Sequence, residues 1–195
     1  TQLAALDTLA VQLDADMHDF RQSVKIVNQM LVSDQKVGLF WDHDSLPDTE
    51  DRWQSEHYDT RGFVVVNSLA DLPSDLSALI CVSLRETLPE LAIPVFKLVP
   101  RCIVAGIGCR RATSFQLLLS LLQQQLAKYQ LDPLALRAIG SVVIKEDEAA
   151  LKHLSACCRV PFELYSVNEL RQHEHLFPSS DFVRQTIGLL GHRRC

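Results

Sequence analysis

One segment near the middle of the chain limits the fold more than any other feature. An apolar run over residues 102–107 ends at two glycines and two arginines, and a leucine-rich pattern of helical period begins soon afterwards. This order predicts a strand, a tight turn and a helix. We expect Gly106 and Gly108 to let the backbone approach a ligand closely or adopt positive φ.

The end of this turn favours an anion. Thr113, with Gln116 three residues later, resembles a capping box that opens the helix. Free amides at a helix start and the adjacent guanidiniums of Arg110 and Arg111 attract carboxylates or phosphates. The two glycines lack the third glycine of a dinucleotide fingerprint, and the chain contains no P-loop pattern. The sequence therefore predicts an anion site that does not bind an adenine dinucleotide.

Short apolar runs alternate with helical patterns along the chain, which predicts the α/β class. In the first half we expect helices near residues 6–13 and 20–31 and strands at 37–41, 63–66, 79–84 and 95–98. In the second half, strands at 102–107, 142–144 and 162–165 alternate with helices at 114–129 and 147–158. This βαβαβ order predicts a mainly parallel sheet with helices on both faces.

Prolines mark a boundary between two small α/β domains. Pro89, Pro94 and Pro100 interrupt the chain after the first set of strands. We therefore predict a domain over residues 1–98 and a second over residues 99–195. Ser166, with Glu169 three residues later, resembles a capping box for one more short helix near the end of the second domain.

Candidate catalytic residues lie in the second of two turns at the predicted strand ends, where parallel sheets bind their ligands. Lys145 could hold a carboxylate or donate a proton, and Glu148 could activate water. The structural alternative is that acidic residues 146–148 stabilise a helix start through its dipole. In the first turn, Cys109 has cationic neighbours that would lower the pKa of its thiol and make it a candidate nucleophile. Packing or ligand contact is the alternative role for Cys109, since no nearby histidine accompanies it.

Composition excludes several classes of function. A net charge of −5 argues against nonspecific binding to nucleic acid or to anionic membranes. No apolar run is long enough to span a bilayer, and we expect a cytoplasmic protein with reduced thiols. The six cysteines lack zinc-type spacing, and His173-Glu174-His175 lacks the spacing that puts two histidines on one helical face. We therefore predict no protein-bound metal.

Several motifs, in sequence order, resemble the CbiG family of cobalamin-biosynthesis proteins. The string Gly-Ile-Gly-Cys-Arg-Arg at residues 106–111, followed by Thr113, resembles the start of that family's C-terminal domain. Further matches lie at residues 141–145 with Glu148 just beyond, at 161–162 and at 178–183. Upstream, residues 6–13, 24–31 and 37–39 resemble the middle region of the same family. The resemblance thus covers nearly the whole chain.

The resemblance implies a cobalt-precorrin-5A hydrolase of anaerobic cobalamin biosynthesis. Such an enzyme opens the ring A δ-lactone, releases acetaldehyde and gives cobalt-precorrin-5B, and its partner is an anionic corrinoid. Lys145 and Glu148 are then the expected catalytic residues. The expected substrate-binding residues are Gly106, Gly108, Cys109, Arg110, Arg111 and Thr113. Cobalt is carried by the substrate, so no cofactor is expected, and other enzymes of the pathway are the protein partners that the resemblance suggests.

Two departures from the family pattern keep an alternative open. The family's N-terminal domain does not precede the middle region, and the small-residue loop and Pro-Ala-Ala helix expected after Gly188 are missing. We therefore expect the chain to be a fragment, an ordered subset of a longer protein, or a gene product with a damaged end. The second half also resembles CobE, a small stand-alone protein of the aerobic pathway. The alternative function is accordingly a non-catalytic corrinoid-binding accessory protein, and a pure interaction module is a third possibility.

Overall fold

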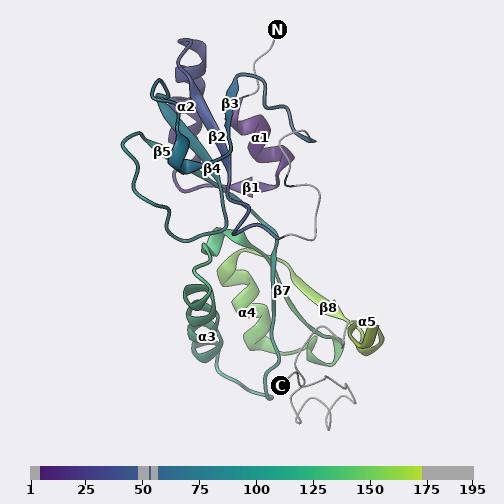
Figure 1. Ribbon diagram of the computed structural model, residues 1–195. Helices are drawn as coiled ribbons and strands as arrows, with labels where there is room; N and C mark the ends of the chain where they lie inside the picture. Colours follow the sequence, from purple (N-terminus) through teal and green to yellow (C-terminus); the bar gives the residue numbers. More distant parts are fainter. Residues whose placement is uncertain (1–4, 48–52, 54–56, 173–195) are drawn as a thin grey trace. The chain divides into compact units, whose positions relative to one another are not determined.

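The computed structural model describes residues 5–47, 53 and 57–172, which form parts of two compact units (Figure 1). The first unit comprises residues 1–103 and 124–136, and the second comprises residues 104–123 and 137–195. The chain therefore leaves the first unit near Ile103 and returns to it for a short segment. The domain division after residue 98 stays a prediction, because a compact unit need not be a separately folding domain.

The first unit is built on a five-stranded sheet. Its elements are α1 (Leu6–Gln12), β1 (Ala15–Asp16), α2 (Phe20–Val32), β2 (Val37–Trp41), β3 (Phe63–Val66), β4 (Ala78–Val82) and β5 (Val95–Pro100). The strand order is β1-β5-β4-β2-β3. Strands β5, β4, β2 and β3 run parallel, and the short β1 pairs antiparallel with β5 at the edge. Two short 3-10 helices, Leu69–Asp71 and Pro133–Ala135, also belong to this unit.

The two faces of this sheet are covered differently. Side chains alternate between the faces along each strand, so Leu39 joins the large core that contains Leu6 of α1 and Val27 of α2. Phe40, the next residue of β2, packs instead with a smaller cluster that includes Leu69. Among the described residues, this second cluster takes its other members from strands and loops and none from α1 or α2.

The second unit is built on a three-stranded sheet of order β6-β7-β8. Strand β7 pairs parallel with β8. The backbone amides of Cys102 and Ile107 donate to the carbonyls of Ala135 and Gly140, at 3.1 and 2.8 Å. Residue numbers increase in the same direction along both strands from the first bond to the second, so β6 also runs parallel to β7. The elements are β6 (Ile103–Gly106), α3 (Phe115–Lys128), β7 (Leu136–Val142), α4 (Ala149–Cys158), β8 (Phe162–Tyr165) and α5 (Val167–Gln172).

Helices α3 and α4 lie side by side. The ring of Phe115 on α3 stacks on the ring of His153 on α4, with centroids 4.1 Å apart. Each helix connects one strand to the next in the order β6-β7-β8, so crossovers of the same hand bring the two helices together. None of the helices among the described residues is long and apolar enough to cross a membrane.

The structure confirms the α/β class and most of the predicted elements, with one error in the second sheet. The predicted strand over residues 142–144 is wrong, because β7 spans Leu136–Val142 and residues 143–145 form a 3-10 turn. Ala138 and Gly140 have low strand propensity, which hid β7 in the sequence. The middle position of the strand compensates, since Ala138, Ile139 and Gly140 are all buried between two neighbours.

Candidate active site in the second unit

The carboxyl ends of β6 and β7 are fixed to each other. The amide of Ile107 donates to the carbonyl of Gly140 at 2.8 Å. In the opposite direction, the hydroxyl of buried Ser141 donates to the carbonyl of Ile107 at 2.8 Å. The turn that follows Ile107 therefore starts from a defined position at the edge of the sheet where a parallel fold binds ligands.

The turn that leads from Ile107 into α3 is closed differently from the prediction. The predicted capping box of Thr113 and Gln116 is wrong: α3 begins at Phe115, and the amide of Leu117 donates to the hydroxyl oxygen of Ser114 at 3.2 Å. The hydroxyl of Thr113 instead donates to the carbonyl of Arg110 at 2.8 Å, within the turn. Thr113 thus shapes the loop that carries the arginines rather than the helix start.

The two glycines of the turn face open space. Neither Gly106 nor Gly108 adopts positive φ. The residue of the turn that does is Ala112, with φ of 57°. A Cβ added to Gly106 or Gly108 would meet no described atom within 4 Å. At Gly140, by contrast, it would lie 3.0 Å from the Tyr165 ring. Close packing against Tyr165 explains the glycine at position 140. At Gly106 and Gly108 the open space is consistent with the predicted close approach of a ligand to the backbone.

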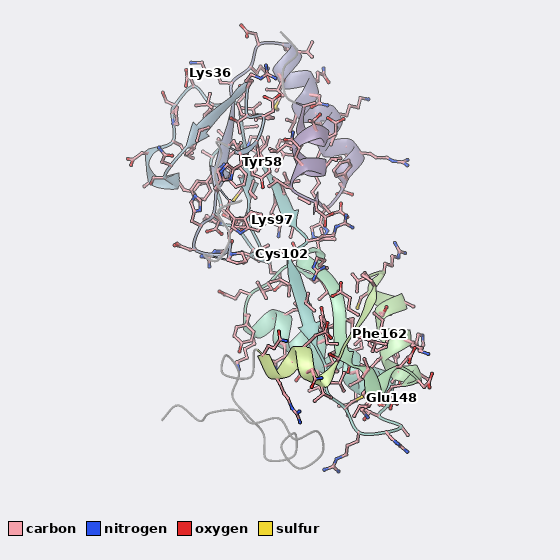
Figure 2. All side chains as sticks on the ribbon, turned by 90° about the vertical axis from the view of Figure 1, so that its right-hand side faces the viewer. Lys36, Tyr58, Lys97, Cys102, Glu148 and Phe162 are labelled. Carbon is pink, nitrogen blue, oxygen red and sulfur yellow. The ribbon has the colours of Figure 1, made fainter. Side chains whose placement is uncertain are left out.

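Lys145 forms a mostly buried ion pair in this region with Glu148, which is labelled in Figure 2. The distance from Lys145 Nζ to Glu148 Oε2 is 3.8 Å, and the two side chains are 16% and 12% exposed. Glu148 is the N-cap residue of α4, but its carboxylate makes no capping hydrogen bond. The carboxylate lies toward Lys145 instead, so a side-chain cap of α4 does not account for this glutamate.

Cys109 lies within electrostatic reach of the same pair. Burial raises the pKa of its thiol, Lys145 lowers that pKa and Glu148 raises it. The prediction that cationic neighbours would lower the pKa is therefore wrong, because burial and the nearby carboxylate outweigh the Lys145 ammonium and the hydrogen bond with Thr113. A thiol with a raised pKa stays protonated at neutral pH and is a poor nucleophile. Cys109 is therefore a protonated thiol within the electrostatic range of Lys145 and Glu148.

Arg110 and Arg111 lie on the exposed outer part of the same turn. The described part of the second unit therefore combines surface cations on the turn with a partly buried Lys-Glu pair at the neighbouring strand end. The predicted roles of these residues in binding and catalysis stay predictions. Residues 173–175 and 178–183 lie outside the described residues.

Over residues 5–47, 53 and 57–172, no group of three or more histidines, cysteines, aspartates or glutamates could hold a metal ion. One polar cluster was missed in the sequence: Asp42, Ser83 and Arg85, in the first unit, are connected by hydrogen bonds. Asp42 is 41 residues from Ser83 and 43 from Arg85, so no local spacing connects it to them. The available signal was that Asp42 and Ser83 each follow a buried strand directly.

Comparison with known proteins supports the order of regions along the chain. Residues 4–96 match the family model described as the cobalamin biosynthesis central region, and residues 103–191 match cobalamin synthesis G C-terminus. Over 188 residues the chain is 56% identical to the cobalt-precorrin-5A hydrolase of Salmonella typhimurium. That match covers 96% of this chain and 52% of the relative, so the chain spans about half the length of that curated protein.

Two solved structures are also similar. CobE, a protein from the cobalamin (vitamin B12) biosynthetic pathway, is 30% identical, with a TM-score of 0.42 over 44% of this chain and 61% of that one. A cobalamin biosynthesis protein G homolog from Sulfolobus solfataricus is 16% identical, with a TM-score of 0.36 over 94% of this chain and 50% of that one. The assignment rests on the sequence matches: the chain belongs to the CbiG family of cobalamin-biosynthesis proteins, of which it carries the central and C-terminal regions.

Proposed function

We propose that this chain takes part in the hydrolysis of cobalt-precorrin-5A and that its second unit supplies the reacting groups. The observation that carries the proposal is the partly buried Lys145-Glu148 pair at the carboxyl edge of the sheet. The name of the Salmonella relative, which is 56% identical, supports the choice of substrate. Cobalt enters this reaction as part of the substrate, and the proposal requires no cofactor.

Substrate binding is assigned to the turn between β6 and α3. The corrinoid intermediate carries acetate and propionate side arms, which are anionic at neutral pH. Exposed guanidiniums of Arg110 and Arg111 would hold these carboxylates by charge-assisted hydrogen bonds. The open space beside Gly106 and Gly108 would let the macrocycle approach the backbone.

Opening the lactone is assigned to Glu148 and Lys145. The Glu148 carboxylate takes a proton from water, and the water oxygen attacks the lactone carbonyl carbon. The Lys145 ammonium stabilises the resulting tetrahedral oxyanion. Collapse of this intermediate breaks the bond between the acyl carbon and the ring oxygen. A carboxyl group then remains on ring A, and the oxygen attached to C20 leaves as an alkoxide.

Release of acetaldehyde follows from that alkoxide. Its oxygen forms a carbonyl with C20, and the bond that still joins C20 to the macrocycle breaks. The electron pair of this bond stays on the macrocycle, which takes the proton that Glu148 removed from water. The products are acetaldehyde and cobalt-precorrin-5B, so one water is consumed and no oxidant or reductant is required.

The test is to incubate the chain with cobalt-precorrin-5A and measure acetaldehyde, next to the full-length Salmonella protein. Release by both, and its loss in Glu148→Gln, would support the assignment. Two results together would overturn the assigned roles. The chain would bind the corrinoid without releasing acetaldehyde, and the Salmonella protein would release acetaldehyde unchanged after substitution of both positions that align with Lys145 and Glu148. The same result would favour the alternative, a corrinoid-binding accessory protein.

A further inference from the structure

The first unit contains a cavity that the proposed hydrolysis does not use. It has a volume of about 430 Å³ and lies where β2, β3 and β4 end. Its walls include Phe40, Asp42, Asp44, Asn67, Leu69 and Arg85. A volume of this size is in the range of small-molecule sites, and the walls combine polar groups with a smaller share of apolar surface.

The position of the cavity follows from the strand order. Strand β2 has β3 on one side and β4 on the other, and all three run parallel. The chain therefore moves to one side after β2 and has crossed to the other side by β4. A crevice forms outside the carboxyl ends at such a reversal of strand order, which is the usual ligand position in open parallel sheets.

A buried network holds one cation at this crevice. The hydroxyl of Ser83, which has no exposed surface, donates to Asp42 Oδ2 at 2.7 Å. Arg85 Nε donates to the same oxygen at 2.9 Å. The amide of Arg85 donates to the Ser83 hydroxyl oxygen at 3.1 Å, which fixes the backbone as well as the side chain. Arg85 is therefore held by its Nε side.

The outer end of the guanidinium remains available. Of its terminal nitrogens, Nη2 lies 4.0 Å from Asp44, whose side chain is 92% exposed and so well screened by water. Within the described part of the chain, no residue accepts a hydrogen bond from Nη1. Two adjacent N–H donors in a plane match the two oxygens of a carboxylate.

The remaining walls suit a carbon skeleton. Phe40 and Leu69 belong to the apolar cluster on this face of the sheet. Cys81 is also part of the wall, and burial raises the pKa of its thiol to about 12, so it is a neutral group at physiological pH. These walls would exclude water from one side of a bound molecule and leave its polar end toward Arg85.

We propose that this cavity binds an organic carboxylate, with Arg85 as the bidentate partner and the carbon stem of the ligand against Phe40 and Leu69. A side arm of a corrinoid and a small free acid share this chemistry. The inference does not rest on the proposed hydrolysis, because it concerns the first unit and is tested with a simple acid.

The experiment is a titration of the 15N-labelled chain with propionate and, separately, with cobyrinic acid, whose side arms end in free carboxylates. The amide signals of Asn67 and Ala70 and the Nε–H signal of Arg85 are followed. Two variants change the cavity and leave the Ser83 hydroxyl to donate to Asp42. Arg85→Lys keeps the charge but removes the planar fork, and Ala70→Trp places a large ring at an exposed position in the cavity wall. Ala127→Trp, on the exposed surface of α3, is the matched control.

We expect saturable shifts of these signals, with binding at least about 10-fold weaker in both cavity variants and unchanged in the control. Tighter binding of cobyrinic acid than of propionate would identify a corrinoid side arm as the ligand, and equal binding would identify a free acid. The proposal is overturned if neither probe gives a saturable shift at these residues, or if Ala70→Trp and Arg85→Lys bind both probes as the unchanged chain does.

Discussion

The charged groups at the strand ends of the two units are held in different ways. In the first unit, Asp42 accepts direct hydrogen bonds from Ser83 and Arg85. In the second unit, Lys145 and Glu148 are 3.8 Å apart, beyond hydrogen-bond distance, although both side chains are mostly buried. A carboxylate with two direct donors has its position fixed by the fold, whereas a more loosely paired one remains available to a substrate.

A second pair in the first unit makes the same contrast. The side chain of Asp132 is 2% exposed and pairs with Lys97, which is labelled in Figure 2. The other carboxylate oxygen of Asp132 accepts from the amide of Leu134 at 2.9 Å. Lys97 also donates to the carbonyls of Arg85 and Glu86, at 2.9 and 2.7 Å. These contacts join segments far apart in sequence, so we infer that the first unit uses its buried charges mainly to hold the fold.

The largest expected effect is on turnover in the second unit. Replacing Glu148 by Gln removes the proposed general base, and replacing Lys145 by Ala removes the oxyanion partner. Loss of a general base commonly lowers a rate by about 10² to 10⁴. We expect acetaldehyde release from cobalt-precorrin-5A to fall by that factor in Glu148→Gln, with the denaturation midpoint close to that of the unchanged chain. A fall of less than about threefold in rate would contradict the assignment of Glu148.

The next effect is on the stability of the first unit. Asp132→Asn keeps the shape of the side chain but leaves the Lys97 ammonium without its charged partner in a mostly buried position. Breaking a buried ion pair in this way costs about 3 kcal/mol. We expect urea denaturation to show a loss of this size, and Glu148→Gln serves as the matched control with a loss below about 1 kcal/mol. Equal losses in the two variants would show that the two units use their buried charges alike.

Binding of the corrinoid should depend on the arginines of the turn. Replacing Arg110 and Arg111 together by Ala removes two charge-assisted contacts, each of which contributes about 1.5 kcal/mol. We therefore expect affinity for a carboxylate-bearing corrinoid to fall by about 100-fold. The measurement is a fluorescence or absorbance titration. Arg137→Ala, at an exposed position in β7, is the control, and unchanged affinity in the double variant would remove the turn from the proposed site.

The sequence predicted those elements whose local pattern agrees with their place in the fold. The strands at residues 63–66 and 162–165 are short, apolar runs and were predicted with the observed bounds. The predicted capping box of Ser166 and Glu169 is confirmed, with reciprocal bonds of 2.7 and 3.2 Å between side chain and backbone. Strand β7 was misplaced because its residues do not form a continuous apolar run. It is buried because a strand lies on each side of it.

The candidate site was predictable in part for the same reason. The turn and the Lys145-Glu148 segment were found, since each is a local pattern next to an apolar run. The effect of burial on Cys109 and the choice of Ser114 over Thr113 as the cap depend on how the turn folds back. The pairs Asp42 with Arg85 and Lys97 with Asp132 connect residues that only the sheet topology brings together.

A smaller effect should distinguish the glycines of the second unit. In Gly140→Ala the new methyl would lie 3.0 Å from the Tyr165 ring and 3.2 Å from a Val104 methyl, so the neighbours must move. We expect this overpacking to cost about 1 to 2 kcal/mol in urea denaturation. Gly106→Ala and Gly108→Ala should stay within about 0.5 kcal/mol, because the methyl meets no described atom. A larger loss in either turn variant would mean that the turn glycines serve the fold.

The smallest effect concerns two thiols, the buried Cys81 of the first unit and the partly buried Cys109 of the second. Burial raises the pKa of Cys81 from its ordinary value of 9.0 to about 12, and it also raises the pKa of Cys109. Between pH 9 and pH 12 the folded state keeps a proton on Cys81 that the unfolded state has lost. Stability therefore falls as pH rises through this range, by at most about 1.4 kcal/mol per pH unit from this group.

Urea denaturation at pH 8, 9 and 10 should show a smaller decline in Cys81→Ala than in the unchanged chain. Cys109→Ala should reduce the decline less, because Cys109 is less buried and Lys145 favours its thiolate. Cys157→Ala, at an exposed position, is the control. An equal decline in all four proteins would show that the wall of the first cavity does not keep the Cys81 thiol protonated.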